Sequence, residues 1–370
     1  MRIVLTGGGT GGHAYPAISI ASALRAEYPD CELLYIGSKK SLEARLAEEA
    51  GIPFFGVTSR KLSKLLSPDT ALTAAALIVG FREALCKLGS FRPDIVIGTG
   101  GYASAAVVMA QSFRRGKTVI LEQDVVAGRT NRVLGRFATK VCLAFEDASR
   151  HFPEDKVVVT GSPIRPELLS LPAKKDARAA LGLEADLFTV LVLGGSQGAR
   201  RLNEVVAASP SDLADLPVQI LHQVGTRNFG EAEERRRASG WPAYHVRAYI
   251  DDMRNAYSAA DLIMCRCGSS TIAEITAVGL PAILVPYPHA HADHQRLNAE
   301  YVAYHGGGIV IGDADLTAEF FANTVKRFVV SPEELETMSE ASKSLGRPNA
   351  AKDIARLAAE LAGARGVEGN

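Results

Sequence analysis

Short runs of apolar and β-branched residues alternate with longer stretches of helical hydrophobic periodicity along the chain. This alternation is typical of βαβ units, in which parallel strands form an open sheet between helices. The strand candidates fall into two series. They are residues 2–6, 33–36, 94–98, 118–121 and 140–143 in the first, and 189–193, 218–222, 245–248, 262–264 and 282–285 in the second. The pattern therefore predicts two open α/β sheets in tandem.

The segment between the two series, residues 160–166, carries two prolines and a glycine, a composition that suits a linker. At 370 residues the chain also exceeds what one hydrophobic core usually supports. We therefore expect a first Rossmann-like domain over residues 1–160 and a second over residues 161–340. The remaining residues, 341–370, are expected to form a helix that packs back on the first domain.

Charge balance and cysteine content narrow the class of protein. Lys and Arg number 41, as do Asp and Glu, so the basic excess typical of nucleic-acid binders is missing. The five cysteines lack CxxC spacing, which favours buried free thiols in a reducing compartment. Met1 leads directly into a strand-like segment, and the longest apolar stretch, residues 71–80, is shorter than the ~20 residues of a membrane span. We therefore expect a cytoplasmic protein that can touch a membrane surface.

Glycine-rich turns follow three of the predicted strands, at the positions where parallel sheets bind ligands. These turns are residues 7–12, 98–101 and 194–198. Glycine lets the backbone approach a phosphate closely, and the following helix directs its N–H groups at the anion. The turns therefore predict a ligand that carries phosphate groups, although a single such turn can also be purely structural.

The first turn also matches the dinucleotide fingerprint GxGxxG, through Gly7, Gly9 and Gly12. An NAD site needs an acidic residue at the end of the second strand, where it binds the ribose hydroxyls. Here that strand is followed by Lys39 and Lys40 instead. An NADP-dependent dehydrogenase therefore stays as an alternative, whereas an NAD-dependent one does not.

His13 directly follows the first glycine turn, at the predicted start of a helix. An imidazole titrates near neutral pH, so His13 could take a proton from an attacking hydroxyl group. The structural alternative is a histidine that hydrogen-bonds to the backbone at the start of the helix. The sequence pattern alone leaves both interpretations open.

A second polar cluster, Gly268-Ser269-Ser270-Thr271-Ile272-Ala273-Glu274, follows a strand of the second series. Its hydroxyl and N–H groups could hold a diphosphate while Glu274 accepts hydrogen bonds from ribose hydroxyls. Alternatively, Thr271 and Glu274 have the spacing of a capping box that begins a helix.

The segment from His289 to Gln295 contains three histidines and an aspartate, which raises the question of a metal site. It lies in a proline-rich loop, so its side chains are not arranged in advance on one helix face, as zinc ligands usually are. We expect no metal here, and instead expect His294 and Gln295 to hydrogen-bond a polar substrate.

An apolar helix face is predicted between residues 60 and 86. Leu77, Ile78 and Phe81 fall at helix-neighbour spacing beside Arg82, with further cations upstream. Apolar burial and basic residues together support reversible attachment to an anionic membrane. The alternative is an amphipathic helix that faces the protein core.

Several segments, in this order along the chain, resemble the MurG family of bacterial glycosyltransferases. They are TGGGTGGHA at 6–14, GTGGYAS at 98–104, EQ at 122–123, GSPIR at 161–165, GGSQGARRLN at 194–203, HQVG at 222–225, YIDDMR at 249–254, ADLIMCRCGSSTIAE at 260–274, GLPAILVPYPHA at 279–290 and DHQRLNA at 293–299. The resemblance implies the GT-B fold, in which two Rossmann-like domains with parallel sheets face each other across a cleft.

The resemblance also implies an activity. It is the inverting transfer of GlcNAc from UDP-GlcNAc to the 4-hydroxyl of undecaprenyl-pyrophosphoryl-MurNAc-pentapeptide, the step from lipid I to lipid II in peptidoglycan synthesis. It implies no cofactor and no obligatory metal. The expected partners are the two substrates, the inner face of the cell membrane, where the enzyme would be peripheral, and cell-wall and division proteins.

Site residues follow from the same resemblance, position by position. His13 is the candidate catalytic base. The donor site comprises Thr10, Gly11, Gly12, Asp124, Arg165, Ser196, Ile250, Met253, Ser269, Ser270, Thr271, Glu274, His294, Gln295 and Asn298. The acceptor pyrophosphate site comprises Gly11, Gly12, Gly100, Gly101 and Tyr102. The membrane patch comprises Leu77, Ile78, Phe81 and Arg82.

This chain departs from the usual family pattern at a few positions. Leu121 and Asp124 stand where His and Asn are usual, and Ser162 stands where Asn is usual. We expect Leu121 to remove an imidazole from the cleft, and Asp124 to replace an amide donor with a carboxylate. Two alternatives follow: a transferase that acts on another lipid acceptor, and a non-catalytic scaffold that binds UDP-GlcNAc.

Overall fold

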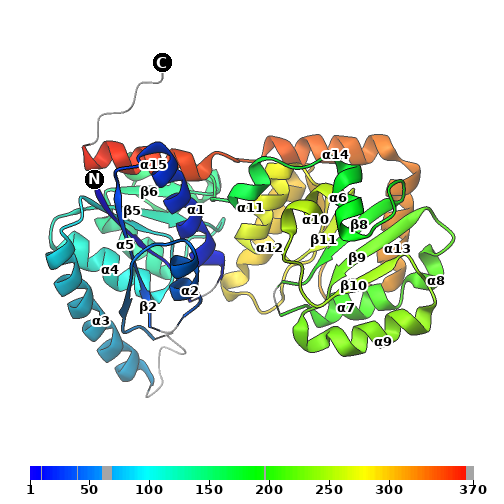
Figure 1. Cartoon of the computed structure of the whole chain (residues 1–370), viewed down its shortest axis with the longest axis horizontal. Coiled ribbons are helices and arrows are strands. Elements are labelled where there is room, and N and C mark those ends of the chain that lie inside the picture. Colours follow the sequence, from blue (N-terminus) through cyan, green and yellow to red (C-terminus); the bar gives the residue numbers. More distant parts are fainter. Residues whose placement is uncertain (10, 40, 61–68, 196, 364–370) are drawn as a thin grey trace. The chain divides into compact units, whose positions relative to one another are not determined.

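The computed structural model describes residues 1–9, 11–39, 41–60, 69–195 and 197–363. The chain divides into two compact units (Figure 1). Unit 1 comprises Met1–Pro166 and the chain from Arg347 onward, and unit 2 comprises Glu167–Gly346. The chain thus passes from one unit to the other a few residues after each of the two expected boundaries.

Unit 1 is built on a seven-stranded sheet whose strand pairs are all parallel, in the order β3-β2-β1-β4-β5-β6-β7. The strands are β1 (Arg2–Thr6), β2 (Glu32–Ser38), β3 (Phe54–Val57), β4 (Ile95–Gly98), β5 (Lys117–Glu122), β6 (Lys140–Leu143) and β7 (Val157–Val159). Its central strands are buried on both faces, so they read as continuous apolar runs.

Helices cover both faces of this sheet. They are α1 (Gly11–Glu27), α2 (Leu42–Glu49), α3 (Asp69–Phe91), α4 (Tyr102–Phe113), α5 (Arg129–Phe137) and α15 (Ala350–Ala362), with 3-10 turns at Glu146–His151 and Glu154–Lys156. Alternate residues of β5 enter different cores: Val119 and Leu121 lie in the core with α1 and α15, and Ile120 lies in the core with α4.

The last helix, α15, belongs to unit 1 although unit 2 precedes it in the chain. Figure 1 shows α15 beside α1. Ile354, Ala355 and Ala358 are fully buried in the core of the sheet. Arg356 also makes a bidentate ion pair with Glu27 of α1, with N–O distances of 2.9 and 3.1 Å.

Unit 2 repeats this architecture with a six-stranded parallel sheet in the order β10-β9-β8-β11-β12-β13. Its strands are β8 (Phe188–Leu193), β9 (Val218–Gln223), β10 (Tyr244–Arg247), β11 (Leu262–Cys265), β12 (Ala282–Leu284) and β13 (Gly308–Val310). Its helices are α6 (Lys174–Leu181), α7 (Arg200–Ala207), α8 (Pro210–Leu213), α9 (Phe229–Ser239), α10 (Met253–Ala259), α11 (Ser269–Val278), α12 (His294–Tyr304), α13 (Ala318–Val330) and α14 (Pro332–Ser344). Further 3-10 turns are Pro166–Leu169, Thr226–Asn228 and His291–Asp293.

The sequence prediction missed three strands, β3, β7 and β13. Each lies at an edge of its sheet and has only three or four residues, too few to show a clear hydrophobic period. Residues 161–164 of the expected linker are buried, and unit 1 extends through Pro166. Nor are all the thiols buried, since Cys86 is exposed.

None of the described helices is both long enough and apolar enough to cross a membrane.

Candidate active site

Each sheet has a topological switch point between two adjacent strands. The connections that follow these two strands lead toward opposite edges of the sheet. The switch point lies between β1 and β4 in unit 1, and between β8 and β11 in unit 2. Open α/β sheets bind ligands outside the carboxyl ends of these strands. The predicted glycine turns follow β1, β4 and β8, so all three lie at a switch point.

In unit 1 the two glycine turns contact each other directly. The Gly8 N–H donates to the carbonyl of Gly100, at an N–O distance of 3.2 Å. Gly101 has a φ of +90°, and a Cβ there would collide with the carbonyl oxygen of Gly8. Behind the first turn lies the buried carboxylate of Glu43, which accepts from the Ser38 N–H at 3.0 Å and leaves no room for a Cβ at Gly8. The position of Gly101 therefore needs glycine, and a side chain at Gly8 would displace the Glu43 carboxylate.

His13 lies in the first turn of α1 and is clamped by Thr99. The Thr99 hydroxyl donates to the carbonyl of His13 at 2.6 Å, and Nδ1 of the imidazole lies 3.1 Å from the carbonyl oxygen of Thr99. The ring also lies against Gly100, where a Cβ would come within 2.6 Å of Nδ1. Gly100 therefore makes room for the imidazole.

Gln123 extends this cluster at the end of β5. Its Nε2 lies 3.0 Å from the Thr99 carbonyl oxygen and 3.1 Å from Nδ1 of His13. The Ser162 hydroxyl donates to Oε1 of Gln123 at 3.2 Å. Gln123 and Ser162 are each only 3% exposed, so these contacts are shielded from water. Neither residue was predicted to have a role, although the EQ and GSPIR motifs contain them.

The neighbouring Glu122 organises the loop after β5. Its carboxylate accepts from the N–H groups of Gln123, Asp124 and Gly128 and from Nδ2 of Asn131, at 2.9–3.1 Å. Burial, followed by the charge of Asp124, raises the pKa of Glu122 to about 7, and the hydrogen bonds from Asn131, Asp124 and Gly128 oppose this rise. The loop thus holds a carboxyl group that can be protonated near neutral pH.

The remaining predicted residues of unit 1 lie close to these turns along the chain. Gly11 and Gly12 begin α1, and Tyr102, 40% exposed, begins α4. The guanidinium of Arg165 lies over the ring of Tyr15, 5.4 Å from its centroid. Thr10, predicted at the donor site, lies outside the described residues.

Leu121 does not face the site, which corrects the expectation drawn from its replacement of histidine. Its side chain is 1% exposed and packs in the core with α1 and α15. Since successive residues of a strand point to opposite faces, the substitution changes the core of unit 1.

In unit 2 the predicted phosphate-binding cluster begins α11, directly after β11. Ser269, Ser270 and Thr271 are its first three residues, and Gly268 is its N-cap. The Ser270 hydroxyl is buried and has no hydrogen-bond partner among the described residues. A buried hydroxyl beside the positive end of a helix is suited to bind an anion.

Thr271 and Glu274 do not form a capping box, because Thr271 lies inside α11 and its N-cap residue makes no side-chain cap bond. Glu274, 6% exposed, instead accepts a 2.8 Å hydrogen bond from the hydroxyl of Tyr257 on α10. This bond fixes one carboxylate oxygen of Glu274.

The polar residues of α12 bind to the end of β11. Oε1 of Gln295 accepts from the N–H groups of Cys267 and Tyr287 at 3.1 and 3.0 Å. The fully buried Asn298 donates from Nδ2 to the Cys267 carbonyl at 3.3 Å. His294 lies at the start of α12, with Nδ1 2.7 Å from the His291 carbonyl oxygen. These contacts bring α12 to the N-terminus of α11.

Gln223, which the sequence analysis did not single out, joins two predicted segments of unit 2. Its Nε2 donates to the Gly195 carbonyl in the glycine turn at 3.2 Å, and its Oε1 accepts from the Ile250 N–H at 2.9 Å. Ile250 and Met253 are each 5% exposed. Ser196 of the same turn lies outside the described residues.

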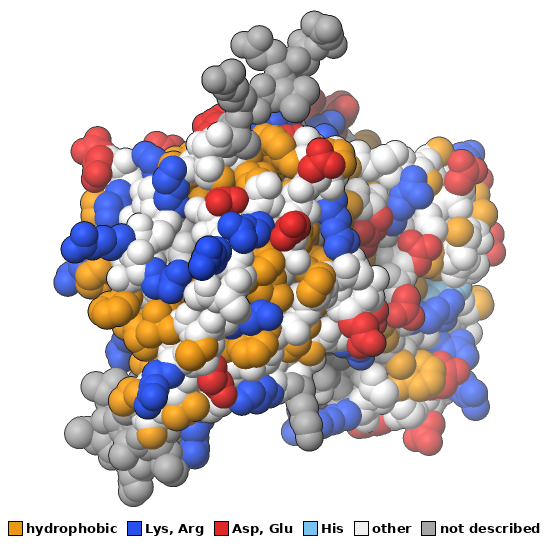
Figure 2. All heavy atoms as spheres, turned by 60° about the vertical axis from the view of Figure 1, so that its left-hand side comes forward, with side chains coloured by type: hydrophobic (Ala, Val, Ile, Leu, Met, Phe, Trp, Pro, Cys, Tyr) orange, Lys and Arg blue, Asp and Glu red, His pale blue; other side chains and the backbone are white. Residues whose placement is uncertain are grey.

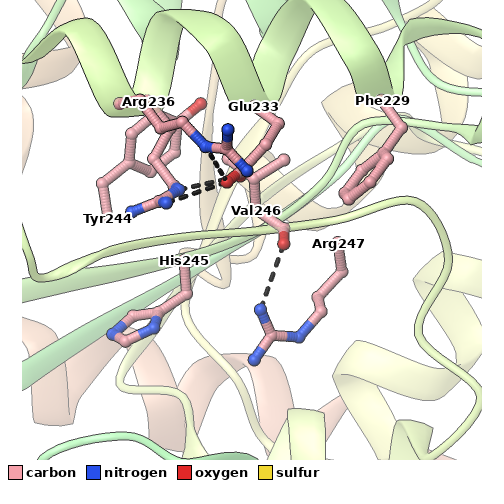
Figure 3. Close-up of a pocket in the computed structure, with 8 residues that line it drawn as sticks. Phe229, Glu233, Arg236, Tyr244, His245, Val246 and Arg247 are labelled. Atoms are coloured by element: carbon pink, nitrogen blue, oxygen red, sulfur yellow. Dashed lines mark hydrogen bonds and ion pairs between the residues drawn. The ribbon is translucent and has the colours of Figure 1, made fainter.

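A separate pocket of unit 2 lies between α9 and the edge strand β10 (Figure 3). Its arginines already have partners: Arg236 and Arg237 pair with Glu233, and Arg247 donates to the Val246 carbonyl. None of the predicted site residues lines this pocket, so the glycine turn after β8 and the N-terminus of α11 remain the candidate site in unit 2.

Comparisons with known proteins identify the family to which both units belong. Residues 3–143 match the glycosyltransferase family 28 N-terminal domain, and residues 189–354 match its C-terminal domain. A relative from Desulforudis audaxviator is 38% identical, over 98% of this chain and 99% of its own length. One from Bacillus subtilis is 36% identical, with 98% and 99% coverage. Both are named UDP-N-acetylglucosamine–N-acetylmuramyl-(pentapeptide) pyrophosphoryl-undecaprenol N-acetylglucosamine transferase. The crystal structure of Acinetobacter baumannii MurG superposes with a TM-score of 0.78 at 28% identity, covering 97% of this chain and 99% of that one.

Two parallel-sheet units with the paired family 28 domains define a glycosyltransferase of the GT-B fold. Within that class, the chain belongs to the MurG family of N-acetylglucosaminyltransferases.

Proposed function

We propose that this chain transfers GlcNAc from UDP-GlcNAc to the 4-hydroxyl of undecaprenyl-pyrophosphoryl-MurNAc-pentapeptide, with inversion at the anomeric carbon. Relatives that are named for this transfer align with the chain over nearly their whole length. The observation that carries the proposal is the imidazole of His13, held by Thr99 at the phosphate-binding turns of unit 1. This arrangement suits deprotonation of a hydroxyl beside a pyrophosphate.

In the proposed reaction His13 takes the proton from the acceptor hydroxyl. The hydroxyl oxygen forms a bond to the anomeric carbon as the bond from that carbon to the UDP oxygen breaks, and the electron pair leaves with UDP. Ser269, Ser270 and the N-terminus of α11 bind the diphosphate and stabilise the negative charge of the leaving UDP. The scheme uses no metal ion and no cofactor.

The test is a radiolabelled transfer assay with UDP-GlcNAc and a lipid-linked MurNAc-pentapeptide analogue. We expect a product with a β-1,4-linked GlcNAc. Asp124, which replaces the usual asparagine, motivates a parallel panel of polyprenyl and glycolipid acceptors. Transfer to another lipid alone would replace the proposed acceptor, and tight UDP-GlcNAc binding without any transfer would mean a non-catalytic scaffold.

We further propose that unit 1 binds the inner face of the cell membrane through a patch on α3, α4 and α5. Figure 2 shows hydrophobic side chains gathered among Lys and Arg side chains on this side of unit 1. The patch comprises Leu77, Ile78, Val79, Met109, Phe113, Val133 and Phe137, which are 38–75% exposed. Phe81, which was predicted to belong to it, is only partly exposed and packs edge-on against Phe113, at 6.0 Å between ring centroids.

Exposed arginines close to patch residues along the chain include Arg82, Arg114, Arg115, Arg132 and Arg136. Each cation near an anionic leaflet contributes about 1 kcal/mol, and each buried apolar side chain contributes up to ~1.5–3 kcal/mol. Together these contributions are large enough for reversible attachment.

We expect Ile78→Glu combined with Phe113→Glu to abolish binding to anionic liposomes while transfer to a soluble acceptor analogue continues. Ile78 and Phe113 are 61% and 75% exposed, so the substitutions should leave the fold intact. Val330→Glu on α13 of unit 2 is the matched control, since Val330 is also 75% exposed. Sedimentation with vesicles measures the effect, and undiminished binding of the double variant would refute the patch.

A further inference from the structure

The pocket between α9 and β10 lies at the free edge of the sheet of unit 2 (Figure 3) and has a volume of about 380 Å³. β10 is the last strand in the sheet order. Tyr244 and Val246 are buried in the core that also contains Ala232 of α9. Since successive residues of a strand point to opposite faces, His245 and Arg247 belong to the other face of β10. Both line the pocket together with residues of α9, so the pocket reaches both faces of β10 around its free edge.

The lining of this pocket carries an excess of positive charge. Three guanidinium groups line it, those of Arg236, Arg237 and Arg247. Among the described lining residues the one carboxylate is that of Glu233, which accepts from Arg236 and Arg237 at 2.8–3.0 Å. Arg247 makes no ion pair with any described residue and donates to backbone carbonyls instead. With a neutral His245 ring, two net positive charges therefore remain in the lining.

Donors for an anion also remain. Arg237 makes its ion pair through Nε, and its side chain is 73% exposed. Arg247 donates from its two terminal nitrogens to the carbonyls of Val246 and Leu181, at 3.1 and 3.5 Å. A guanidinium has more N–H groups than such bonds use, and it binds oxyanions with two parallel hydrogen bonds. Nε2 of His245 is buried without a hydrogen-bond partner among the described residues, which is unusual for a polar atom.

The structural alternative is that these arginines protect the edge strand from pairing with another sheet. Such protection requires charge but no hollow, whereas here the arginines line one. Its volume lies within the range of ~300–1,000 Å³ that is typical of small-molecule sites. Phe229, 37% exposed, adds an apolar wall to the lining. A charged pocket with an aromatic wall is suited to an organic anion.

We propose that this pocket binds a phosphate monoester whose organic group packs against Phe229. A phosphate monoester carries about −1.5 to −2 charges at neutral pH, which matches the two net positive charges of the lining. A single carboxylate would leave one of these charges without a counterion. The pocket shares no residue with the glycine turn after β8 or with α11, so this binding does not depend on the proposed transfer.

Calorimetric titration of the full chain with phenyl phosphate tests the proposal. Arg247→Gln and Arg237→Gln each remove charge-assisted hydrogen bonds, so the affinity should fall about ten-fold or more in each variant. Arg235→Gln is the matched control, because Arg235 is also an exposed arginine of α9 in an ion pair but does not line the pocket. Absence of binding to the wild type, or an equal loss in the control, would overturn the proposal and favour edge protection.

Two further variants examine where the phosphate and its organic group bind. Ser270→Ala should leave the affinity for phenyl phosphate unchanged, since Ser270 lies at the candidate diphosphate site on α11. A loss in Ser270→Ala in place of the arginine variants would move the probe to that site and refute binding at the pocket. Phe229→Ala should weaken the binding of phenyl phosphate but not that of inorganic phosphate. Equal affinities for phenyl phosphate in Phe229→Ala and the wild type would contradict the packing against Phe229.

The titration of His245 provides a local readout. Burial, followed by the charges of Arg247 and Arg236, holds the pKa of His245 below its usual value. A bound dianion opposes these positive charges, so phenyl phosphate should raise this pKa. NMR of the ring protons measures it, with the signals assigned from His245→Gln. An unchanged His245 titration while phenyl phosphate binds would place the probe elsewhere and overturn the proposal.

Phosphate monoesters occur both as free metabolites and as lipid headgroups, and two probes distinguish these sources. Glycerol 3-phosphate represents the free ester, and phosphatidic acid in phosphatidylcholine vesicles represents the headgroup. Binding of either probe that Arg247→Gln and Arg237→Gln weaken, and Arg235→Gln does not, supports the site and identifies the source. If neither probe shows this dependence, the pocket is not a site for phosphate monoesters.

Discussion

The switch points of the two units have the same topology but satisfy their polar groups differently. In unit 1 hydrogen bonds run from the Thr99 carbonyl through Gln123 to Ser162, although Oγ1 of Thr6, before the first glycine turn, is buried without a partner among the described residues. In unit 2 the Ser270 hydroxyl is buried at the N-terminus of α11 with no partner among the described residues.

This difference matches the chemistry proposed for each unit. A base must be oriented before the substrate arrives, so its partners belong to the protein. A diphosphate supplies its own acceptor oxygens, so a site for it can leave a donor hydroxyl without a protein partner. The same sheet topology thus supports a preorganised base in unit 1 and an anion site in unit 2, and substitutions confined to one unit can separate the two roles.

The largest effect is expected from His13→Ala in unit 1. A positioned general base contributes about 10²- to 10⁴-fold to rate, so kcat should fall by that factor. UDP binding should stay near normal, because the diphosphate-binding groups on α11 belong to unit 2. Steady-state kinetics and UDP titration measure the two quantities, and wild-type turnover in the variant would disprove the assignment of the base.

The pH dependence of stability should also differ between the units. In unit 2 the ring of His222 is fully buried, between the Tyr244 hydroxyl and Oδ1 of Asn203, and burial lowers its pKa to about 3. Because this pKa lies below the unfolded value of ~6.5, the stabilisation is complete above pH ~6.5 and is lost as the pH falls. The expected slope is about 1.4 kcal/mol per pH unit below 6.5.

Trp241 provides the measurement, because it is the only tryptophan, lies in unit 2 and stacks on Tyr244. Urea unfolding followed by its fluorescence should show a flatter pH dependence between pH 4.5 and 6.5 in His222→Gln than in the wild type. Identical slopes would show that His222 does not titrate on unfolding.

Unit 1 contains the opposite case in Glu122, whose pKa is raised to about 7 by burial and by Asp124. A raised carboxyl pKa stabilises the folded state below the unfolded value of ~4.3, and this stabilisation is lost as the pH rises through 7. Hydrogen exchange of the β1 amides measures this effect. Between pH 4.5 and 7 the wild type should lose protection against exchange, and Glu122→Gln should lose less. An unchanged pH dependence would argue against this titration.

The sequence predicted the features that repeat along the chain. Alternating apolar runs identified the central strands and the parallel-sheet fold, and the glycine motifs marked the turns at both switch points. The edge strands β3, β7 and β13 were missed because a run of three or four residues carries little periodic signal.

Contacts between residues far apart in the chain could not be predicted from the pattern of hydrophobic and polar positions. Gln123 meets His13 across 110 residues and Ser162 across 39, so neither partner could be found from local spacing. The inward direction of Leu121 depends on where β5 begins, and strand ends are the least certain part of a sequence prediction. The capping-box interpretation failed for the same reason, because α11 begins two residues before Thr271.

The smallest effects should come from two serines of unit 2, and they distinguish a hydroxyl that binds ligand from one that binds protein. Ser270→Ala removes a donor to the diphosphate, a charge-assisted bond worth about 1.5 kcal/mol or more, so UDP affinity should fall roughly ten-fold. The free energy of unfolding should stay the same or rise, because a buried hydroxyl without a described protein partner is removed.

Ser342→Ala is the matched control, since Ser342 is fully buried and donates to the Leu280 carbonyl at 3.2 Å. Its loss should lower the free energy of unfolding by about 1 kcal/mol and leave UDP affinity unchanged. Calorimetric titration with UDP and urea unfolding of both variants complete the test. If Ser270→Ala behaved like Ser342→Ala, its hydroxyl would have a structural partner, and the contrast drawn between the two switch points would fail.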